Sequence, residues 1–138
     1  MPDLKLICEG LAFPEGPISL ADGSFLVVEV AGGNLTRISP EGKRTVVAKL
    51  GGGPNGAAIG PDGHVYVCNN GGLEWHQMGE LLVPGNQPAD YSGGSIQGVD
   101  LTTGSVTMVA PHEVASKRHL GIVVTFLPAI TPEVARIS

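Results

Sequence analysis

The sequence predicts an all-β fold, because one pattern of turn and strand residues occurs in it twice. Residues 14–23 read PEGPISLADG, and residues 54–63, forty positions later, read PNGAAIGPDG. The match continues, with FLVVE at 25–29 against VYVCN at 65–69. A repeat of roughly 40 to 50 residues with strand-like content is typical of β-propellers, in which each repeat forms one blade. We therefore expect about two blades, each a four-stranded antiparallel meander.

The composition agrees with this fold class. Glycine and proline number 21 and 11 among 138 residues, as expected for short strands joined by tight turns. Hydrophobic residues make up 42% of the chain and aromatic residues only 4%. The core is therefore expected to consist mainly of Val, Ile and Leu, which favour strands.

The first blade is predicted to span about residues 11–50. Its four strands are expected at 18–20, 25–30, 35–38 and 44–48. The turns between them carry Asp-Gly, Gly-Gly-Asn and Pro-Glu-Gly, which are typical turn sequences. A weakly alternating run at 4–8 predicts one more strand before the blade.

The second blade is predicted to span about residues 51–110 and to contain an insertion at about 71–92, between its second and third strands. Long insertions at one turn of a blade often carry function. No third copy is recognisable after this, so 1–110 is predicted to be a partial propeller and 111–138 a divergent tail. A frame shift in a longer gene is one explanation for the tail; translating the other two frames from around codon 108 would test it.

The charge balance excludes several classes of partner. The net charge is −5 and the isoelectric point about 5.2, which argues against nucleic acid and against anionic membrane surfaces. No apolar run approaches the ~20 residues of a membrane span, and the start of the chain does not resemble a signal peptide.

We expect cytoplasmic residence, with Cys8 and Cys68 as small buried hydrophobic residues.

Glu15 and Asn55 occupy the same position in the two copies. Equivalent positions of successive blades face a common axis, so we expect these two side chains to converge. A carboxylate and an amide oxygen suit Ca²⁺ above all, with Zn²⁺ and Mn²⁺ as the other candidates. Because Ca²⁺ takes about six to eight oxygens, further blades or water would have to complete the site. The alternative is that Glu15 is a solvated loop charge.

The insertion begins close to a third candidate, Asn69, which ends the second strand of its blade. Trp75 and His76 follow within the insertion. One interpretation makes the insertion a lid or wall that brings these three side chains to the substrate. The other makes it a glycine-rich loop with Trp75 packed on the edge of the blade.

Several motifs together resemble a known family. They are FPEGP at 13–17, GGPNG at 52–56, PDG at 61–63 and VYVCNNGG at 65–72, and they resemble the family of senescence marker protein, gluconolactonase and luciferin-regenerating enzyme. The resemblance covers roughly residues 4–110. It implies a six-bladed propeller of about twice this length that hydrolyses lactones, or sometimes organophosphates, with a divalent cation in its central channel.

The resemblance also implies roles for single residues. Glu15 would be the metal ligand of the first blade. Asn55 falls on the asparagine of the second blade, which contacts the metal in some members and the substrate in others. Some members use an arginine two residues before this asparagine to bind substrate, whereas this chain has Gly53 there. A later asparagine ligand and an aspartate proposed as the base belong to blades beyond the two recognised.

Two functional hypotheses follow. The first is a metal-dependent hydrolase of lactones, including sugar-acid lactones, in an incomplete version with no catalytic residue assigned. The second is a non-catalytic pair of blades that binds other copies or a partner through open sheet edges.

Overall fold

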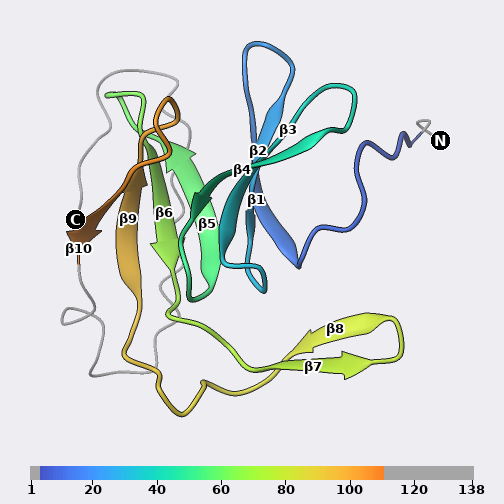
Figure 1. Cartoon of the computed structure of the whole chain (residues 1–138), viewed down its shortest axis with the longest axis vertical. Coiled ribbons are helices and arrows are strands. Elements are labelled where there is room, and N and C mark those ends of the chain that lie inside the picture. The colour runs from blue at the N-terminus through green and yellow to red at the C-terminus, as the bar shows by residue number, and fades with distance from the viewer. Residues whose placement is uncertain (1–3, 111–138) are drawn as a thin grey trace.

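The computed structural model describes residues 4–110, and all the regular elements in this range are β-strands. Two four-stranded antiparallel sheets lie side by side (Figure 1). Blade one consists, in spatial order, of β1 (Pro14–Ser19), β2 (Phe25–Glu29), β3 (Asn34–Ile38) and β4 (Arg44–Lys49). Blade two consists of β5 (Pro54–Ile59), β6 (Val65–Asn69), β9 (Ser95–Val99) and β10 (Val106–Ala110). The remaining strands, β7 (Trp75–Met78) and β8 (Leu81–Pro84), pair with each other as a separate hairpin.

The predicted all-β class and the meander order are confirmed. The strand expected at 4–8 is wrong: this segment crosses one face of blade one, where it lines an apolar groove with Phe25 and Val27, and its backbone joins no sheet. The first strand is also longer than expected, because β1 already begins at Pro14. The tail predicted at 111–138 lies outside the described residues. Within residues 4–110, no helix has the length and apolar character needed to cross a membrane.

The core lies between the two blades. Side chains alternate across each sheet, so a blade has two faces. We call face A of blade one the side that carries Leu26, Val28 and Leu35, and face B of blade two the side that carries Val65, Val67 and Val99. These six residues are 0% exposed and belong to one apolar cluster, which Ala48 and Leu50 join. Face A of one blade therefore packs on face B of the next.

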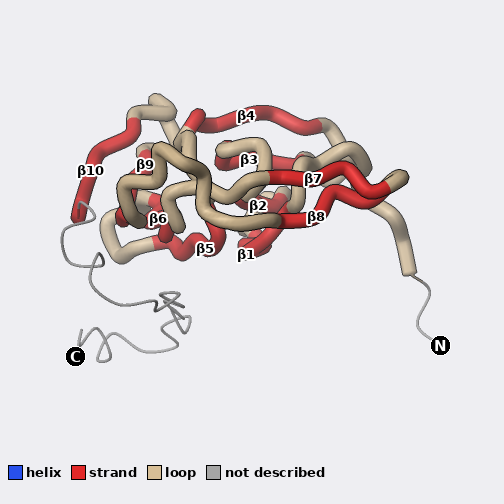
Figure 2. Tube along the Cα trace, turned by 90° about the horizontal axis from the view of Figure 1, so that it is seen from below, coloured by secondary structure: helices blue, strands red, loops and turns tan. Residues whose placement is uncertain are grey.

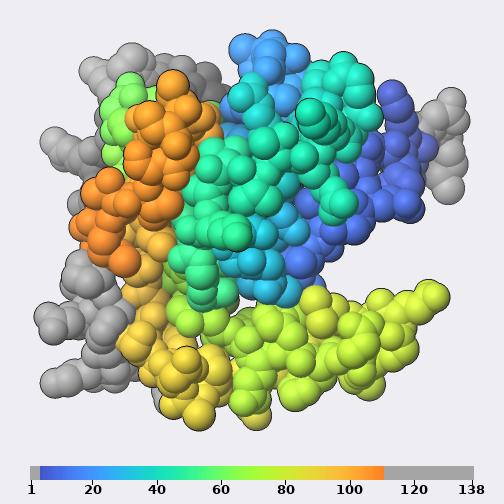
Figure 3. Space-filling view, in the orientation of Figure 1, coloured from blue at the N-terminus to red at the C-terminus, as the bar shows by residue number. Residues whose placement is uncertain are grey.

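The insertion hairpin lies outside both sheets. In Figure 1 it runs below the lower end of blade one, and Figure 2, seen from below, shows it across that end. The space-filling view shows a notch between its tip and the N-terminal segment (Figure 3). The insertion at 71–92 thus contains regular structure, although it belongs to neither sheet.

The first turns of the two blades are built alike. Asp22 Oδ1 accepts a hydrogen bond from the backbone N–H of Ser24 (3.0 Å), and Asp62 Oδ1 accepts one from His64 (3.1 Å). Both turns follow the ends of the first strands, so Glu15 and Asn55, near the starts of β1 and β5, lie at the opposite end. The repeat therefore brings both candidate ligands to one end of the blade pair.

Candidate metal and substrate site

Glu15 and Asn55 lie on adjoining strands, β1 and β5, and both are exposed. The two strands approach closely: a Cβ added at Gly16 would lie 3.2 Å from the backbone N of Ala57 and 3.3 Å from Cα of Gly56. Gly16 also has φ of +55°, a conformation that favours glycine. This close approach places the candidate ligands at neighbouring points of the two inner strands.

Both candidate ligands stand next to a β-bulge. The register between β1 and β2 shifts between Glu15 and Ile18, and that between β5 and β6 shifts between Pro54 and Gly56. Bulges re-aim side chains and are frequent beside functional sites. Among residues 4–110, neither Glu15 nor Asn55 has a side-chain hydrogen-bond partner. Within this range, their oxygens are not used by another side chain or by backbone.

The donor set is suited to a hard cation but small. A carboxylate and an amide oxygen are the donors that Ca²⁺ prefers. The part of the chain that the structure describes contains no cluster of three or more His, Cys, Asp or Glu side chains that could hold a metal. The two residues can thus supply part of a coordination sphere, and a bound cation would keep open positions for water or substrate.

Trp75 lies against the segment that leads into β1. Its ring centroid is 5.0 Å from that of Phe13, with the ring planes tilted by 52°. Phe13 stands two residues before Glu15, so the hairpin is joined to the strand that carries the candidate carboxylate. Phe13 has φ of +59°, which is strained for a bulky side chain.

His76 does not share this contact. Consecutive residues of a strand point to opposite sides, so its side chain leaves the hairpin away from Trp75. It is exposed, and its ring lies over Gly85 at the end of the hairpin. Of the two insertion residues expected at the substrate, the structure thus brings only Trp75 toward the segment that carries Glu15.

The family model described as SMP-30/Gluconolactonase/LRE-like region matches residues 13–120. The chain belongs to this family. The match begins at Phe13 and so includes the inner strands of both blades, and the resemblance predicted from the sequence motifs is confirmed. No curated protein matches the chain.

In this gluconolactonase-family chain, the side chain of Asn69 is buried and fully hydrogen-bonded. It is 7% exposed, and all four of its hydrogen-bonding positions are used. Oδ1 accepts from the N–H groups of Gly53 (2.9 Å) and Gly71 (3.0 Å), and Nδ2 donates to Gly51 O (2.8 Å) and Gln97 Oε1 (3.0 Å). This position favours a structural role over the substrate contact expected from the sequence.

Sequence reasoning missed three buried polar residues next to the entries of the inner strands: Glu29, Thr36 and Gln97. Glu29 occupies the position equivalent to Asn69, and it is also 7% exposed. Thr36 and Gln97 are equivalent to each other as well, and each bonds to its neighbour on the second strand. The repeat itself contained this signal, because all four residues occur at matching positions of the two copies.

Gly53, where some members of the family have arginine, has a physical reason to be glycine here. A Cβ at this position would overlap the side-chain amide of Asn70. Asn70 is itself fixed, because its N–H donates to Gly53 O (2.8 Å) and its Oδ1 accepts from the N–H of Gly72 (2.8 Å). The space beside Asn55 is therefore bordered by an amide.

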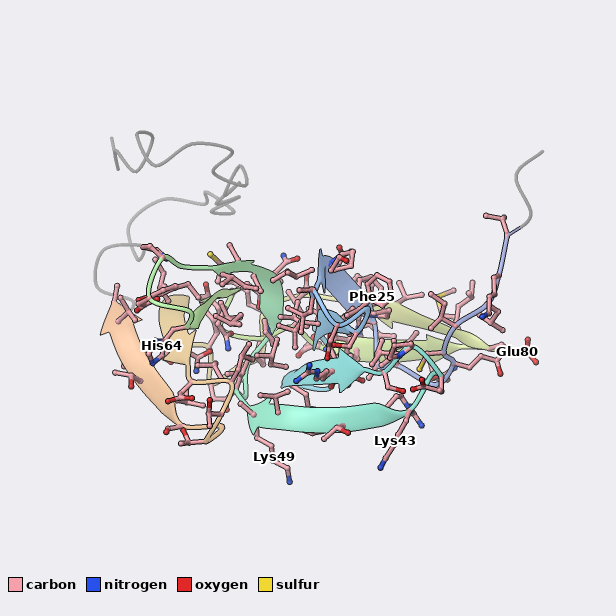
Figure 4. All side chains as sticks on the ribbon, turned by 90° about the horizontal axis from the view of Figure 1, so that it is seen from above. Phe25, Lys43, Lys49, His64 and Glu80 are labelled. Carbon is pink, nitrogen blue, oxygen red and sulfur yellow. The ribbon has the colours of Figure 1, made fainter. Side chains whose placement is uncertain are left out.

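A polar hollow of about 280 Å³ lies at the other end of blade two. Asp62, His64 and Asp100 line it, and Figure 4 shows His64 beside the β10 end of the blade. The Tyr66 hydroxyl, which donates to Asp62, holds the pKa of that carboxyl below its ordinary value. Backbone N–H groups of Thr102 and Thr103 lower the pKa of Asp100 in the same way. These carboxylates stabilise turns, and the hollow is remote from Glu15 and Asn55.

Proposed function

We propose that this chain carries part of the site of a metal-dependent lactone hydrolase, with Glu15 and Asn55 as cation ligands. One observation carries the proposal: equivalent positions of two adjoining inner strands present a carboxylate and an amide oxygen that have no hydrogen-bond partner among the described residues. Membership of the gluconolactonase family supports cyclic esters, including sugar-acid lactones, as substrates.

The donor chemistry supports Ca²⁺ as the cation, with Zn²⁺ and Mn²⁺ as alternatives to be compared. A bound cation of this kind would polarise a lactone carbonyl and acidify a water molecule. Glu15 would contribute charge and one or two oxygens, and Asn55 a neutral oxygen. Both follow a proline, which limits the backbone freedom lost on binding. Cation and lactone would be held by residues that are already in place.

The Phe13–Trp75 pair supports an apolar wall beside this site. Aromatic rings offer a flat surface with little side-chain entropy to lose, so they can orient the hydrocarbon part of a lactone ring. In this proposal the wall orients the substrate and Glu15 with Asn55 binds the cation. The proposal assigns no proton acceptor.

The experiment is a Ca²⁺ titration combined with an assay of gluconolactone hydrolysis. We expect Ca²⁺ to raise the melting temperature, and Glu15→Gln or Asn55→Leu to abolish that rise along with any hydrolysis. Glu80→Gln is the matched control, because Glu80 is an exposed carboxylate at the tip of the hairpin (Figure 4). Unchanged melting and hydrolysis with Ca²⁺, Zn²⁺ and Mn²⁺ would refute the proposal. Cytoplasmic residence is part of it, supported by the free thiols of Cys8 and Cys68.

A specific observation favours the second candidate function, assembly with further blades. Blade one has its own face B, formed by Pro17, Phe25, Val27 and Ile38, and these residues line an apolar groove of about 350 Å³. The equivalent face of blade two is sealed by blade one. The N-terminal segment lines the same groove through Lys5 to Cys8 and Leu11. Face A of another blade, such as that of a second copy, would take the place of this segment on an apolar face.

Sedimentation velocity over a range of chain concentrations tests this assembly. We expect a concentration-dependent increase in mass, reversed by Phe25→Lys at the groove (Phe25 is labelled in Figure 4). Val46→Lys is the control, because Val46 is 48% exposed on β4 and does not line the groove. A monomer at every concentration would exclude this candidate.

A further inference from the structure

Each blade buries one polar pair between its second and third strands. In blade one, Thr36 Oγ1 donates to Glu29 Oε1 at 2.5 Å. In blade two, Asn69 Nδ2 donates to Gln97 Oε1 at 3.0 Å. None of the four side chains is more than 7% exposed. Buried polar groups are costly unless bonded, so a pair retained at the same place in both copies calls for an explanation.

The two pairs have complementary lengths. Glu29 is long and Thr36 short, whereas Asn69 is short and Gln97 long. Both pairs are diagonal neighbours, because Thr36 pairs with Val27 and Gln97 with Val67, two residues before the acid or amide. In each blade, one long and one short side chain together span the diagonal between the two strands. The side chains differ between the blades, so we infer that the fold requires the hydrogen bond between the strands and not a particular residue.

The second strand's member of each pair also binds backbone outside its sheet. Glu29 Oε2 accepts the N–H of Ala12 (2.7 Å), and Asn69 Oδ1 accepts the N–H of Gly53 (2.9 Å). These residues stand three and two positions before Glu15 and Asn55. Glu29 has the longer side chain, and it binds a backbone N–H that is one residue further from the candidate ligand than the N–H bound by Asn69.

The segment that leads into β1, residues 12–14, has a strained backbone. Phe13, between Ala12 and Pro14, has φ of +59°, and such strain persists only where the surroundings fix it. The N–H groups of Val30 and Ala31 bond to the carbonyls of Phe13 (2.9 Å) and Ala12 (3.1 Å). With Glu29, three hydrogen bonds from consecutive residues clamp the entry to β1.

We propose that Glu29 and Asn69 are paired positioning residues, which fix the entry of each inner strand and thereby the relative positions of Glu15 and Asn55. The relevance to cation binding rests on the proposed function, whereas the positioning itself does not. Each acts through backbone, and neither contacts the cation. Thr36 and Gln97 complete the device by orienting the acid and the amide.

The test compares Glu29→Leu, which fills the volume but accepts no hydrogen bond, with Glu29→Gln, which keeps an acceptor. The readouts without cation are amide exchange at Ala12 and the fluorescence emission of Trp75, the chain's one tryptophan, whose ring contacts that of Phe13. For Glu29→Leu we expect Ala12 exchange about fivefold faster or more and altered Trp75 emission. Glu29→Gln should stay close to the unaltered chain. Asn69→Leu should likewise speed amide exchange at Gly53.

The second readout is the dissociation constant for Ca²⁺. Removal of a group that orients a metal ligand weakens binding by about tenfold or more, and we expect this of Glu29→Leu and Asn69→Leu. Thr36→Val should have an intermediate effect. Val99→Ala is the control for lost stability, because Val99 is a fully buried core residue that bonds to neither entry segment.

The outcomes separate the two claims. If Glu29→Leu and Thr36→Val change amide exchange and Trp75 emission no more than Val99→Ala does, the positioning role is overturned. If Glu29→Leu does not fold, Thr36→Val and Glu29→Gln decide by the same readouts. If the unaltered chain binds no Ca²⁺, the proposed function fails, while the exchange measurements still decide whether the acid and the amide position the strands.

Discussion

Blade one and blade two share a backbone plan and differ in the chemistry placed on it. Both have a proline before the candidate ligand, a bulge beside it, and an Asp-Gly turn at the far end. At the inner strand, however, blade one has a carboxylate, Glu15, where blade two has an amide, Asn55. The buried position on the second strand repeats the same difference, with Glu29 against Asn69.

The repeat preserves backbone geometry more strictly than charge. Hydrogen-bond acceptors remain at both positions, so the backbone contacts survive the exchange of acid for amide. At these two positions only blade one has a carboxylate. A cation bound between the blades would thus be neutralised from one side and coordinated by a neutral oxygen from the other.

The largest difference in stability is expected between equivalent residues of the two blades in and beside the core. Leu35 and Ile96 occupy equivalent positions, but Leu35 is fully buried between the blades and Ile96 only partly buried. Leu35→Ala should lower the free energy of unfolding by about 3 kcal/mol through loss of contacts and a cavity, and Ile96→Ala by about 1 kcal/mol. Urea unfolding measures both. Equal losses would mean that face A of blade two is packed as tightly as face A of blade one.

The next largest effect on stability is expected when the polar pair of blade two is placed in blade one. Glu29→Asn and Thr36→Gln together place the pair of blade two into blade one. Each single change should cost about 1–2 kcal/mol, since one leaves a hydrogen bond unmade and the other overfills its site. The double variant should recover about 1 kcal/mol of the summed cost, as coupled neighbours do. Strict additivity in a double-mutant cycle would show that the lengths are not complementary.

A smaller effect concerns the hairpin that only blade two carries. Trp75→Ala should cost about 1 kcal/mol beyond its loss of buried area, because the aromatic contact with Phe13 is removed. His76→Ala should cost less than about 0.5 kcal/mol, as an exposed residue does. Thermal unfolding of the two variants compares them directly. A larger loss for the histidine would contradict the orientation of the hairpin.

The smallest effect is in the two Asp-Gly turns. The Ser24 side chain, its N–H group and Arg37 lower the pKa of Asp22 below its ordinary 3.8, and the Tyr66 hydroxyl does so for Asp62. A folded-state pKa below the unfolded one gives stability that is present above about pH 4 and is lost as the pH falls further. The melting temperature should therefore fall slightly less between pH 6 and pH 3 in Asp22→Asn and in Asp62→Asn than in the unaltered chain. An unchanged acid decline would exclude this contribution.

Much of the fold could be predicted from the sequence. The repeat predicted the starts of β2 and β4 to the residue, because apolar runs between glycine-containing turns leave little choice of boundary. The inner strands were underestimated, because Pro14, Gly16 and Pro17 read as a loop. Their pairing with β2 overrides that propensity, with a bulge absorbing the irregularity.

The candidate site could be predicted in part. The offset of forty residues identified Glu15 and Asn55 without any structure, since equivalent positions of a repeat share an environment. The start of the insertion indicated Asn69, but the burial and the hydrogen bonds of this side chain depend on Gly51, Gly53 and Gln97, which converge only in three dimensions. The contact of Trp75 with Phe13 is likewise tertiary, because the hairpin that carries it folds back from another blade.

The central claim is that Glu15 and Asn55 form one site across two blades. The most direct measurement is a Ca²⁺ titration of the ¹⁵N-labelled chain, following the backbone amides of both residues. We predict that both signals shift along one curve with a single dissociation constant, and that Glu15→Gln removes the shift at Asn55. Shifts with different dissociation constants, or an Asn55 signal that follows Ca²⁺ unchanged in Glu15→Gln, would contradict the account.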